Sequence, residues 1–119
     1  MKIMNLTPHA MVIFDSTGAT EVAHVEASGK VARVLTETTE AGVVSIDGVE
    51  IPVVKTSYGQ VENLPEVEEG TTFVVSILVI GALRALGINR GDVVSPDTGP
   101  QSVVRDGEGK ILGVKRFTR

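Results

Sequence analysis

The longest apolar stretch of the chain, residues 71–87, predicts a short strand followed by a helix. Residues 73–75 (Phe-Val-Val) are aromatic and β-branched, as in buried strands. Ser76 stands where its hydroxyl can accept a free amide of the first helical turn. Gly87 stands where a left-handed residue can end the helix. We therefore expect one main helix at about residues 76–86.

Both faces of this helix are apolar. At 100° per residue, one face carries Leu78, Val79, Ala82, Leu83 and Leu86. The opposite face carries Ile77, Ile80, Gly81 and Arg84. A helix that is apolar nearly all round needs cover on two sides. In a chain of this length we expect a second subunit to give that cover, so the helix is predicted to lie at or near the interface of a homo-oligomer.

The remaining residues show the short alternation and the turn residues that are typical of strands. Residues 10–25 predict a hairpin, as do residues 42–55 around the turn Asp47-Gly48 and residues 103–117. Pro52 cannot donate a main-chain hydrogen bond, so its strand is expected at a sheet edge or a bulge.

Shorter strands are predicted outside these hairpins, at residues 1–6 (an edge strand), 31–35, 60–64 and 92–95. The polar residues 36–40 are expected to be exposed. The prediction is a strand-rich α+β domain, residues 1–119, of antiparallel hairpins with one main helix.

The amino-acid composition is typical of a globular protein and argues against several other classes. The 119 residues are 42% hydrophobic and 22% charged, which is ordinary for a globular domain. The chain has no cysteine, which excludes disulfides and argues against the common structural zinc sites. The apolar run 73–83 is too short to span a bilayer, and no signal peptide is apparent. We expect a cytoplasmic protein without metal or cofactor.

Charge is unevenly distributed along the chain. The net charge is −4, with four basic and eleven acidic side chains in residues 1–83 (−7) and seven basic and four acidic in residues 84–119 (+3). An acidic chain is a poor general binder of long nucleic acid. Its arginine-rich last third can still hold a small phosphorylated ligand. The alternative is that these arginines are solvated or pair with the acidic part.

Two stretches outside the C-terminal third carry candidate binding residues. The turn Asn5-Leu-Thr-Pro-His9 places Thr7 and His9 between two strands, where with Asn5 they could contact a ligand. Alternatively, the turn is purely structural, because Asn and Thr side chains bond to local backbone. Arg33 lies in an apolar strand, and a buried or half-buried arginine there needs an anion, either a carboxylate or a ligand.

The predicted pocket lies near the helix start and the basic C-terminal third. The loop 95–100 combines hydroxyl groups, a glycine amide and nearby arginines, which are the groups that bind phosphate. The helix start adds free amides. The full set of predicted ligand-binding residues is Asn5, Thr7, His9, Arg33, Ser76, Arg90, Thr98, Gly99, Arg105 and Arg116.

The sequence contains no recognisable catalytic motif. Ser76 lacks the Gly-x-Ser-x-Gly surroundings of a serine hydrolase, and no phosphate-binding P-loop, dinucleotide fingerprint or metalloprotease motif occurs. His9 is the one plausible acid–base residue, with Thr7 or Ser76 as its partner.

Across nearly its full length the chain resembles a family of small proteins encoded by bacterial phages and prophages. The matching segments are Asn5–His9, residues 29–34, residues 51–54, residues 73–76 with the following helix, and residues 105–113. The resemblance implies a phage origin and action in the host cytoplasm. Proteins of this kind are similar to anti-defence sponges, which bind cyclic nucleotide or cyclic ADP-ribose signals of host immunity without cleaving them. The predicted binding residues are chosen for the chemistry of their side chains, because no sponge motif can be aligned with them.

Three functions follow as hypotheses. The first is a non-catalytic homo-oligomer that sequesters a nucleotide-derived immune signal. The second is a phosphodiesterase or lyase that degrades the same signal. The third is a minor virion component or an inhibitor of a host protein.

Overall fold

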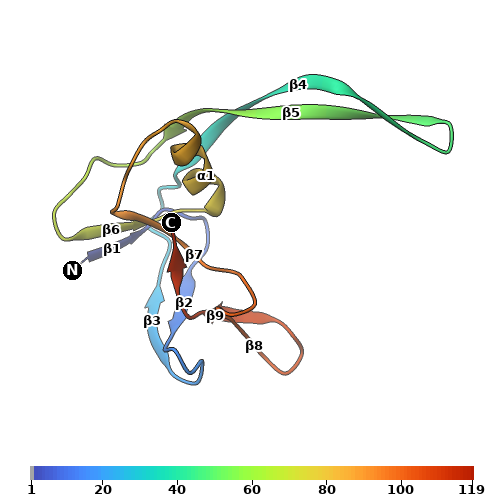
Figure 1. Cartoon of the computed structure of the whole chain (residues 1–119). Coiled ribbons are helices and arrows are strands. Elements are labelled where there is room, and N and C mark those ends of the chain that lie inside the picture. Colours follow the sequence, from blue (N-terminus) through green and yellow to red (C-terminus); the bar gives the residue numbers. More distant parts are fainter. Residues whose placement is uncertain (1) are drawn as a thin grey trace.

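The computed structural model describes residues 2–119, which form several small sheets and a single helix (Figure 1). The elements are β1 (Lys2–Asn5), β2 (Met11–Phe14), β3 (Glu21–Val25), β4 (Arg33–Ile46), β5 (Val49–Glu62), β6 (Thr71–Val74), α1 (Ile77–Ala85), β7 (Val93–Pro96), β8 (Val103–Arg105), β9 (Ile111–Val114) and β10 (Phe117–Thr118). The strand-rich α+β class with one main helix is confirmed. Met1, the first residue of the expected edge strand, lies outside the described residues.

The first sheet has the order β1-β6-β7-β10 and places α1 beside it. β1 pairs with β6 in parallel, and β6 pairs with β7 in parallel, while β10 runs antiparallel to β7. Parallel pairing departs from the expected antiparallel hairpins. For β6 and β7 the cause is the helix, because α1 is the crossover that returns the chain to start β7 in the direction of β6. β1 occupies the sheet edge, as predicted.

The second sheet has the order β3-β2-β9-β8 and contains two of the predicted hairpins. β2 pairs with β3 and β8 pairs with β9, both antiparallel. The two hairpins meet where Ile13 of β2 lies beside Val114 of β9. Gly113 makes this approach possible, because a Cβ there would lie 2.4 Å from the carbonyl oxygen of Val12. The sheet therefore depends on a glycine that no turn requires.

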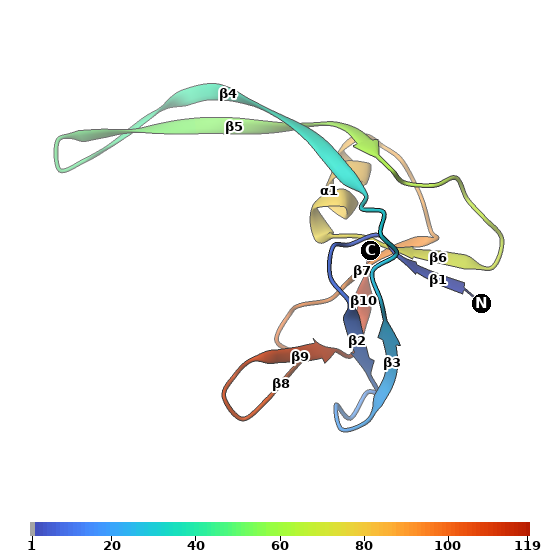
Figure 2. The same ribbon diagram turned by 180° about the vertical axis from the view of Figure 1, so that it is seen from behind.

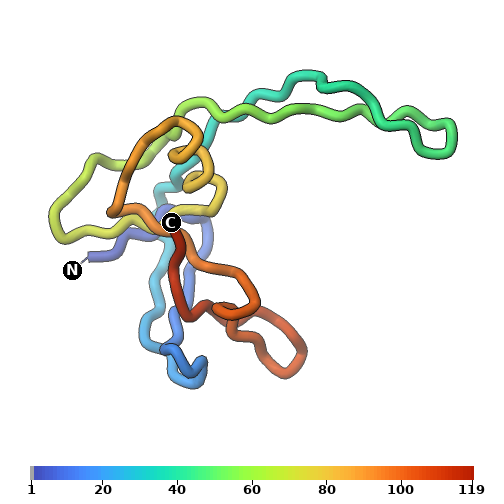
Figure 3. The backbone as a smooth tube through the Cα atoms, viewed as in Figure 1, coloured from blue at the N-terminus to red at the C-terminus, as the bar shows by residue number. Residues whose placement is uncertain are grey.

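β4 and β5 form one long hairpin, the arm, which stands away from the rest of the molecule in both views (Figures 1 and 2). The molecule extends 53 × 40 × 23 Å and its radius of gyration is 17.6 Å. A compact chain of this length has a radius of about 13–14 Å. The smooth trace shows the same projection of the arm (Figure 3).

The arm is longer than the predicted hairpin at residues 42–55. The strand expected at 31–35 and the exposed residues 36–40 are parts of β4, and most of the piece expected at 60–64 belongs to β5. Residues 36–39 are exposed, as expected, and they pair with residues 55–58 within the arm. Three of the four are threonines, which favour strands.

The turn and the irregularities of the arm follow the sequence. Asp47 (φ 51°) and Gly48 (φ 80°) are both left-handed, as a two-residue hairpin turn requires. The pairing register shifts between Glu40 and Val43, and Val43 lies opposite Pro52. Each strand of a two-stranded sheet is an edge, so the prediction for Pro52 is confirmed.

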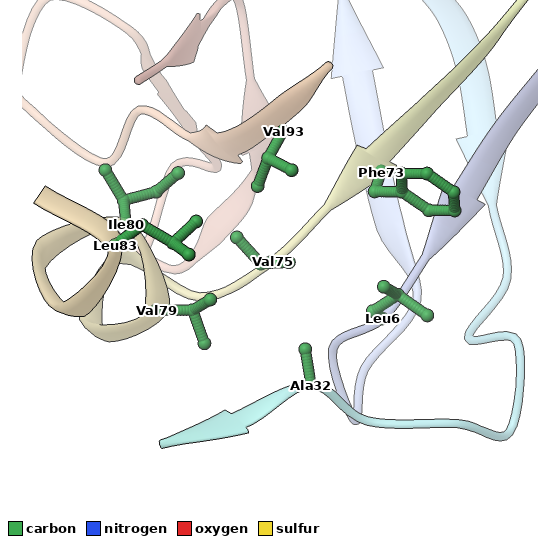
Figure 4. Packing of buried hydrophobic residues seen from close by; sticks show 8 residues of the cluster. All are labelled: Leu6, Ala32, Phe73, Val75, Val79, Ile80, Leu83 and Val93. Carbon is green, nitrogen blue, oxygen red and sulfur yellow. The ribbon is translucent and has the colours of Figure 1, made fainter. Parts of the chain in front are cut away.

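The main core lies between α1, the first sheet and the base of the arm (Figure 4). Its buried residues are Leu6, Ala32, Phe73, Val75, Val79, Ile80, Leu83 and Val93. The prediction of which helix residues face the core is thus partly wrong. Leu78 and Leu86 are exposed, whereas Ile80, assigned to the second face, is buried. The helix is turned toward Ile80 because β7 and the arm base pack against that side.

The two ends of α1 differ from each other in how closely they match the prediction. Ser76 is the N-terminal cap residue, but its hydroxyl makes no capping hydrogen bond. Gly87 is left-handed (φ 72°), and the Ile88 amide donates to the Leu83 carbonyl at 2.9 Å, which closes the helix as predicted. No helix within residues 2–119 is long and apolar enough to cross a membrane.

Candidate functional site

A cavity of about 250 Å³ lies beside the C-terminal end of α1, and we call it the α1 cavity. Its lining residues are Ile80, Leu83, Arg84, Ile88, Asn89, Arg90, Val93 and Arg119. Four of these side chains are aliphatic, three are arginines and one is an amide. An apolar wall beside several cations distinguishes this cavity from an ordinary gap between core side chains.

Three elements bring these residues together. Ile80, Leu83 and Arg84 come from the last turns of α1, and the left-handed Gly87 turns the chain back over them. Arg119 follows β10, the edge strand beside β7. A guanidinium nitrogen of Arg84, Nη2, donates to the main-chain oxygen of Arg119, 35 residues away. The cavity is therefore a product of the tertiary fold.

Arg90 is held by the protein itself. Its Nε and Nη2 donate to the two carboxylate oxygens of Asp92, each at 2.8 Å, and Nη2 also donates to the Pro65 carbonyl at 2.9 Å. The hydrogen bond with Arg90 is the main reason why the pKa of Asp92 is lowered, and it raises the pKa of Arg90. The positive charge of Arg90 is thus balanced by the Asp92 carboxylate.

Arg84 and Arg119 are the exposed cations of the α1 cavity. Within residues 2–119, no Asp or Glu side chain forms an ion pair with either of them. A guanidinium group has five N–H donors, so Arg84 keeps donors beyond the one bonded to Arg119. These two side chains can therefore bind an anion from solution.

A second cavity, of about 350 Å³, adjoins the first at the base of the arm. It is lined by Gln60, Val61, Leu64, Leu83, Leu86, Ile88 and Arg90. Leu83, Ile88 and Arg90 line both cavities, so these residues form the wall between them. The second cavity is mostly aliphatic and contains one arginine that is already paired.

The side chains of the N-terminal turn, residues 5–9, form hydrogen bonds within the protein, as expected if the turn is purely structural. Asn5 is 1% exposed, and its Nδ2 donates to the carbonyls of His9 (2.8 Å) and Val25 (3.3 Å). Its Oδ1 accepts from the Thr7 amide (3.0 Å) and hydroxyl (2.7 Å). The Asn5 side chain thus uses both donors and both lone pairs inside the protein. His9 is exposed. A ligand-binding role for this turn stays a prediction.

Arg33 and Ser76 are both exposed. Arg33 begins β4 opposite Glu62, at the base of the arm. The expectation of a buried or half-buried arginine is wrong, because the neighbours of Arg33 point to the other side of the strand: Ala32 is buried and Val34 is half-buried.

The predicted C-terminal residues are spread over two regions. Arg116 pairs with Asp97, whose Oδ1 also accepts the Gly99 amide at 2.9 Å, and Thr98 is exposed. The bond with Arg116 is the main cause of the lowered pKa of Asp97. Arg105 donates to the Gly109 carbonyl at 2.7 Å in the β8–β9 hairpin. In Figures 1 and 2 that hairpin lies in the lower part of the molecule, whereas α1 lies above it at the base of the arm. The α1 cavity thus contains only Arg90 of the predicted set.

The sequence prediction overlooked Arg84 and Arg119 as a pair. One signal for Arg84 was available, because it is the one charged residue of an otherwise apolar helix and stands in the last turn, where the partial negative charge of the helix end favours a cation. No sequence spacing could connect Arg84 with Arg119. Within residues 2–119, no group of three metal-ligating side chains occurs. Comparisons with protein-family models, curated proteins and solved structures found no match to the chain.

Proposed function

We propose that this chain binds a small phosphorylated, nucleotide-like ligand in the α1 cavity and sequesters it without cleaving it. The observation that carries the proposal is the meeting of two exposed guanidinium groups, Arg84 and Arg119, with the aliphatic wall of the cavity. Arginine binds phosphate oxygens through paired N–H donors. The aliphatic wall offers an apolar surface to a base.

The size of the cavity limits the ligand. Sites for small molecules usually have volumes of about 300–1,000 Å³, and the α1 cavity, at about 250 Å³, is slightly smaller. One nucleotide-sized unit fits such a volume better than a cyclic oligonucleotide. We therefore favour a cyclic mononucleotide or a compact cyclic ADP-ribose type of signal with part of the molecule outside the cavity.

The chemistry of the lining supports binding without cleavage. Phosphodiester hydrolysis requires a positioned acid or base, most often His, Asp or Glu. The cavity lining has three arginines and Asn89, but no His, Asp or Glu side chain. Arginines that remain protonated stabilise a bound phosphate without transferring a proton to it. The absence of His, Asp and Glu from the lining supports a non-catalytic sponge. In line with the expected phage origin, we propose that it acts in the host cytoplasm as a homo-oligomer.

A thermal-shift screen tests the proposal, with 3′,5′- and 2′,3′-cyclic mononucleotides and linear and cyclic ADP-ribose isomers as the probes. A rise in melting temperature with one probe is expected, and mass spectrometry after heat release should recover that probe intact. Recovery of a hydrolysed or isomerised product would favour the phosphodiesterase or lyase. Absence of any shift across the screen would overturn the proposal and favour a protein partner.

A further inference from the structure

The outer half of the arm has one purely apolar face, the tip face. It consists of Val44, Ile46, Val49, Ile51 and Val53. Val44 lies opposite Ile51 and Ile46 lies opposite Val49, so these side chains point to the same side of the hairpin, as does Val53 two residues further on. All five are between 37 and 59% exposed. The other side of the same segment is mixed, because it carries Ser45 and Glu50 beside Val43, Pro52 and Val54.

An exposed apolar face of this kind indicates that another protein surface packs against it. A sheet face made only of large aliphatic side chains is typical of a face that packs against another surface. A two-stranded hairpin by itself is marginally stable in water, and strands usually have three to ten residues, whereas β4 and β5 have 14 each. The arm leaves the body of the molecule beside α1, and its tip points away from the body (Figures 1 and 2).

The same chain carries a second uncovered apolar surface, the helix patch. It lies on the side of α1 opposite its buried residues and consists of Ile77, Leu78, Gly81 and Ala85, of which Ile77 is 61% and Leu78 48% exposed. The tip of the arm cannot reach the helix patch of its own chain because the arm points away from the body (Figures 1 and 2). The arm of a second copy has no such restriction.

The net charge of the arm is opposite in sign to that of the C-terminal third of the chain. Residues 33–62 carry two basic and five acidic side chains, a net charge of −3. Residues 84–119, which begin within α1, carry a net charge of +3. Of these basic side chains, Arg84 lies in α1 and its guanidinium group is bonded to Arg119, so an acidic arm is attracted to the two arginines that lie beside the helix patch.

We propose that two copies of this chain exchange their arms, with the tip face of each copy seated on the helix patch of the other. A two-fold axis makes the two contacts identical, so one chain supplies both complementary surfaces. This arrangement covers both apolar surfaces at once and goes beyond the ligand binding proposed above, on which it does not depend.

Light scattering after gel filtration tests the assembly. The wild-type chain should have twice its mass of 12.5 kDa at micromolar concentration. Val44→Asp places a charge in the tip face and should raise the dissociation constant of the dimer by roughly a hundredfold or more. The matched control is Ser45→Asp, one residue away on the other side of β4, which should leave the mass unchanged. Val44 is exposed in the single chain, so the charge does not threaten its core.

Cross-linking tests which surfaces meet. Since the chain has no cysteine, Ile51→Cys and Ile77→Cys can be made in separate chains with tags of different mass. Mild oxidation of the mixture should give a disulfide between the two tagged chains, whereas Ser45→Cys with Ile77→Cys should give none. A monomeric wild type would overturn the arm exchange. So would a dimer that Val44→Asp and Ser45→Asp affect equally, or equal cross-linking by both cysteine pairs.

Discussion

Arg90 holds Asp92 through two parallel hydrogen bonds of 2.8 Å, with the two side chains only 16% and 15% exposed. The pair fixes the segment between α1 and β7, and the further bond of Arg90 to Pro65 ties it to the loop before β6. Bidentate guanidinium–carboxylate pairs are strong and geometrically specific. Arg90 therefore positions the wall of the α1 cavity.

Arg90→Ala should destabilise the fold. Removal of the cation leaves the Asp92 carboxylate largely buried without a partner, and the free energy of unfolding should fall by about 3 kcal/mol. Arg33→Ala is the control, because that arginine is exposed, and the change should stay within about 0.5 kcal/mol. Urea denaturation of both variants gives the comparison. Similar losses in the two would mean that the Arg90 pair contributes no more than a surface charge.

Acid should abolish the contribution of this pair. The pKa of Asp92 is lowered from its ordinary value of 3.8, chiefly by Arg90. A carboxyl with a lowered pKa stabilises the fold fully above that ordinary value, and the contribution is lost as pH falls through the lowered one. The difference in unfolding free energy between wild type and Asp92→Asn should thus shrink below about pH 4. Denaturation curves measured at a series of pH values check this.

Asp97 provides the comparison for the acid experiment. Its pKa is also lowered, chiefly by Arg116, but that arginine is 55% exposed. Solvent and salt screen an exposed pair, so Asp97→Asn should cost less than Asp92→Asn, and its effect should weaken as salt is added. A larger loss for Asp97→Asn would reverse this ranking of the two pairs.

Gly113→Ala should disrupt the second sheet. The added Cβ would lie 2.4 Å from the Val12 carbonyl oxygen and 2.8 Å from a ring carbon of Phe14, so β2 and β9 must separate. Overpacking of this kind costs about 1–3 kcal/mol. Gly81→Ala, in α1 with no heavy atom of another element within 4 Å, should raise stability by about 0.5–1 kcal/mol. Melting temperatures that move in the same direction would contradict this prediction.

Arg84→Ala should weaken binding of whichever phosphorylated probe shifts the melting temperature. Charge-assisted contacts contribute about 1.5–3 kcal/mol, so affinity should fall about tenfold to a hundredfold. Lys110→Ala, in the turn of the β8–β9 hairpin, should change affinity little, and added salt should weaken wild-type binding. Isothermal titration measures all three. Equal affinity in the two variants would place the ligand outside the α1 cavity.

Local sequence signals predicted the local structure well. Gly87 and the turn Asp47-Gly48 ended the helix and reversed the arm as expected, because their conformations are set by residues beside them. The length of the arm was missed because its threonine-rich segment was expected only to be exposed and was assigned to no strand, although threonine is a good strand residue. The parallel pairing of β1 with β6 was missed because it joins segments far apart in the sequence, Lys2 with Thr71 for example.

The candidate site was harder to predict. Arg33 was expected to be buried or half-buried because its neighbours are apolar, but alternate residues of a strand face opposite sides. Arg84 and Arg119 are joined only by the fold, so neither composition nor spacing could connect them. Ile80 was assigned to the outer face of α1 and is buried. An Ile80→Asp variant would therefore unfold the core, and Ile77→Asp is the variant that probes the helix patch.

The register shift opposite Pro52 has a consequence for how this protein behaves at high concentration. Long hairpins with open edges can add further strands without limit, which is how amyloid fibrils grow. Proline has no amide to donate, and the irregularity between Glu40 and Val43 interrupts the edge of the partner strand. Together they shorten the length over which a foreign strand could align with the arm. An exposed apolar hairpin can thus remain part of a finite assembly and resist conversion into fibres.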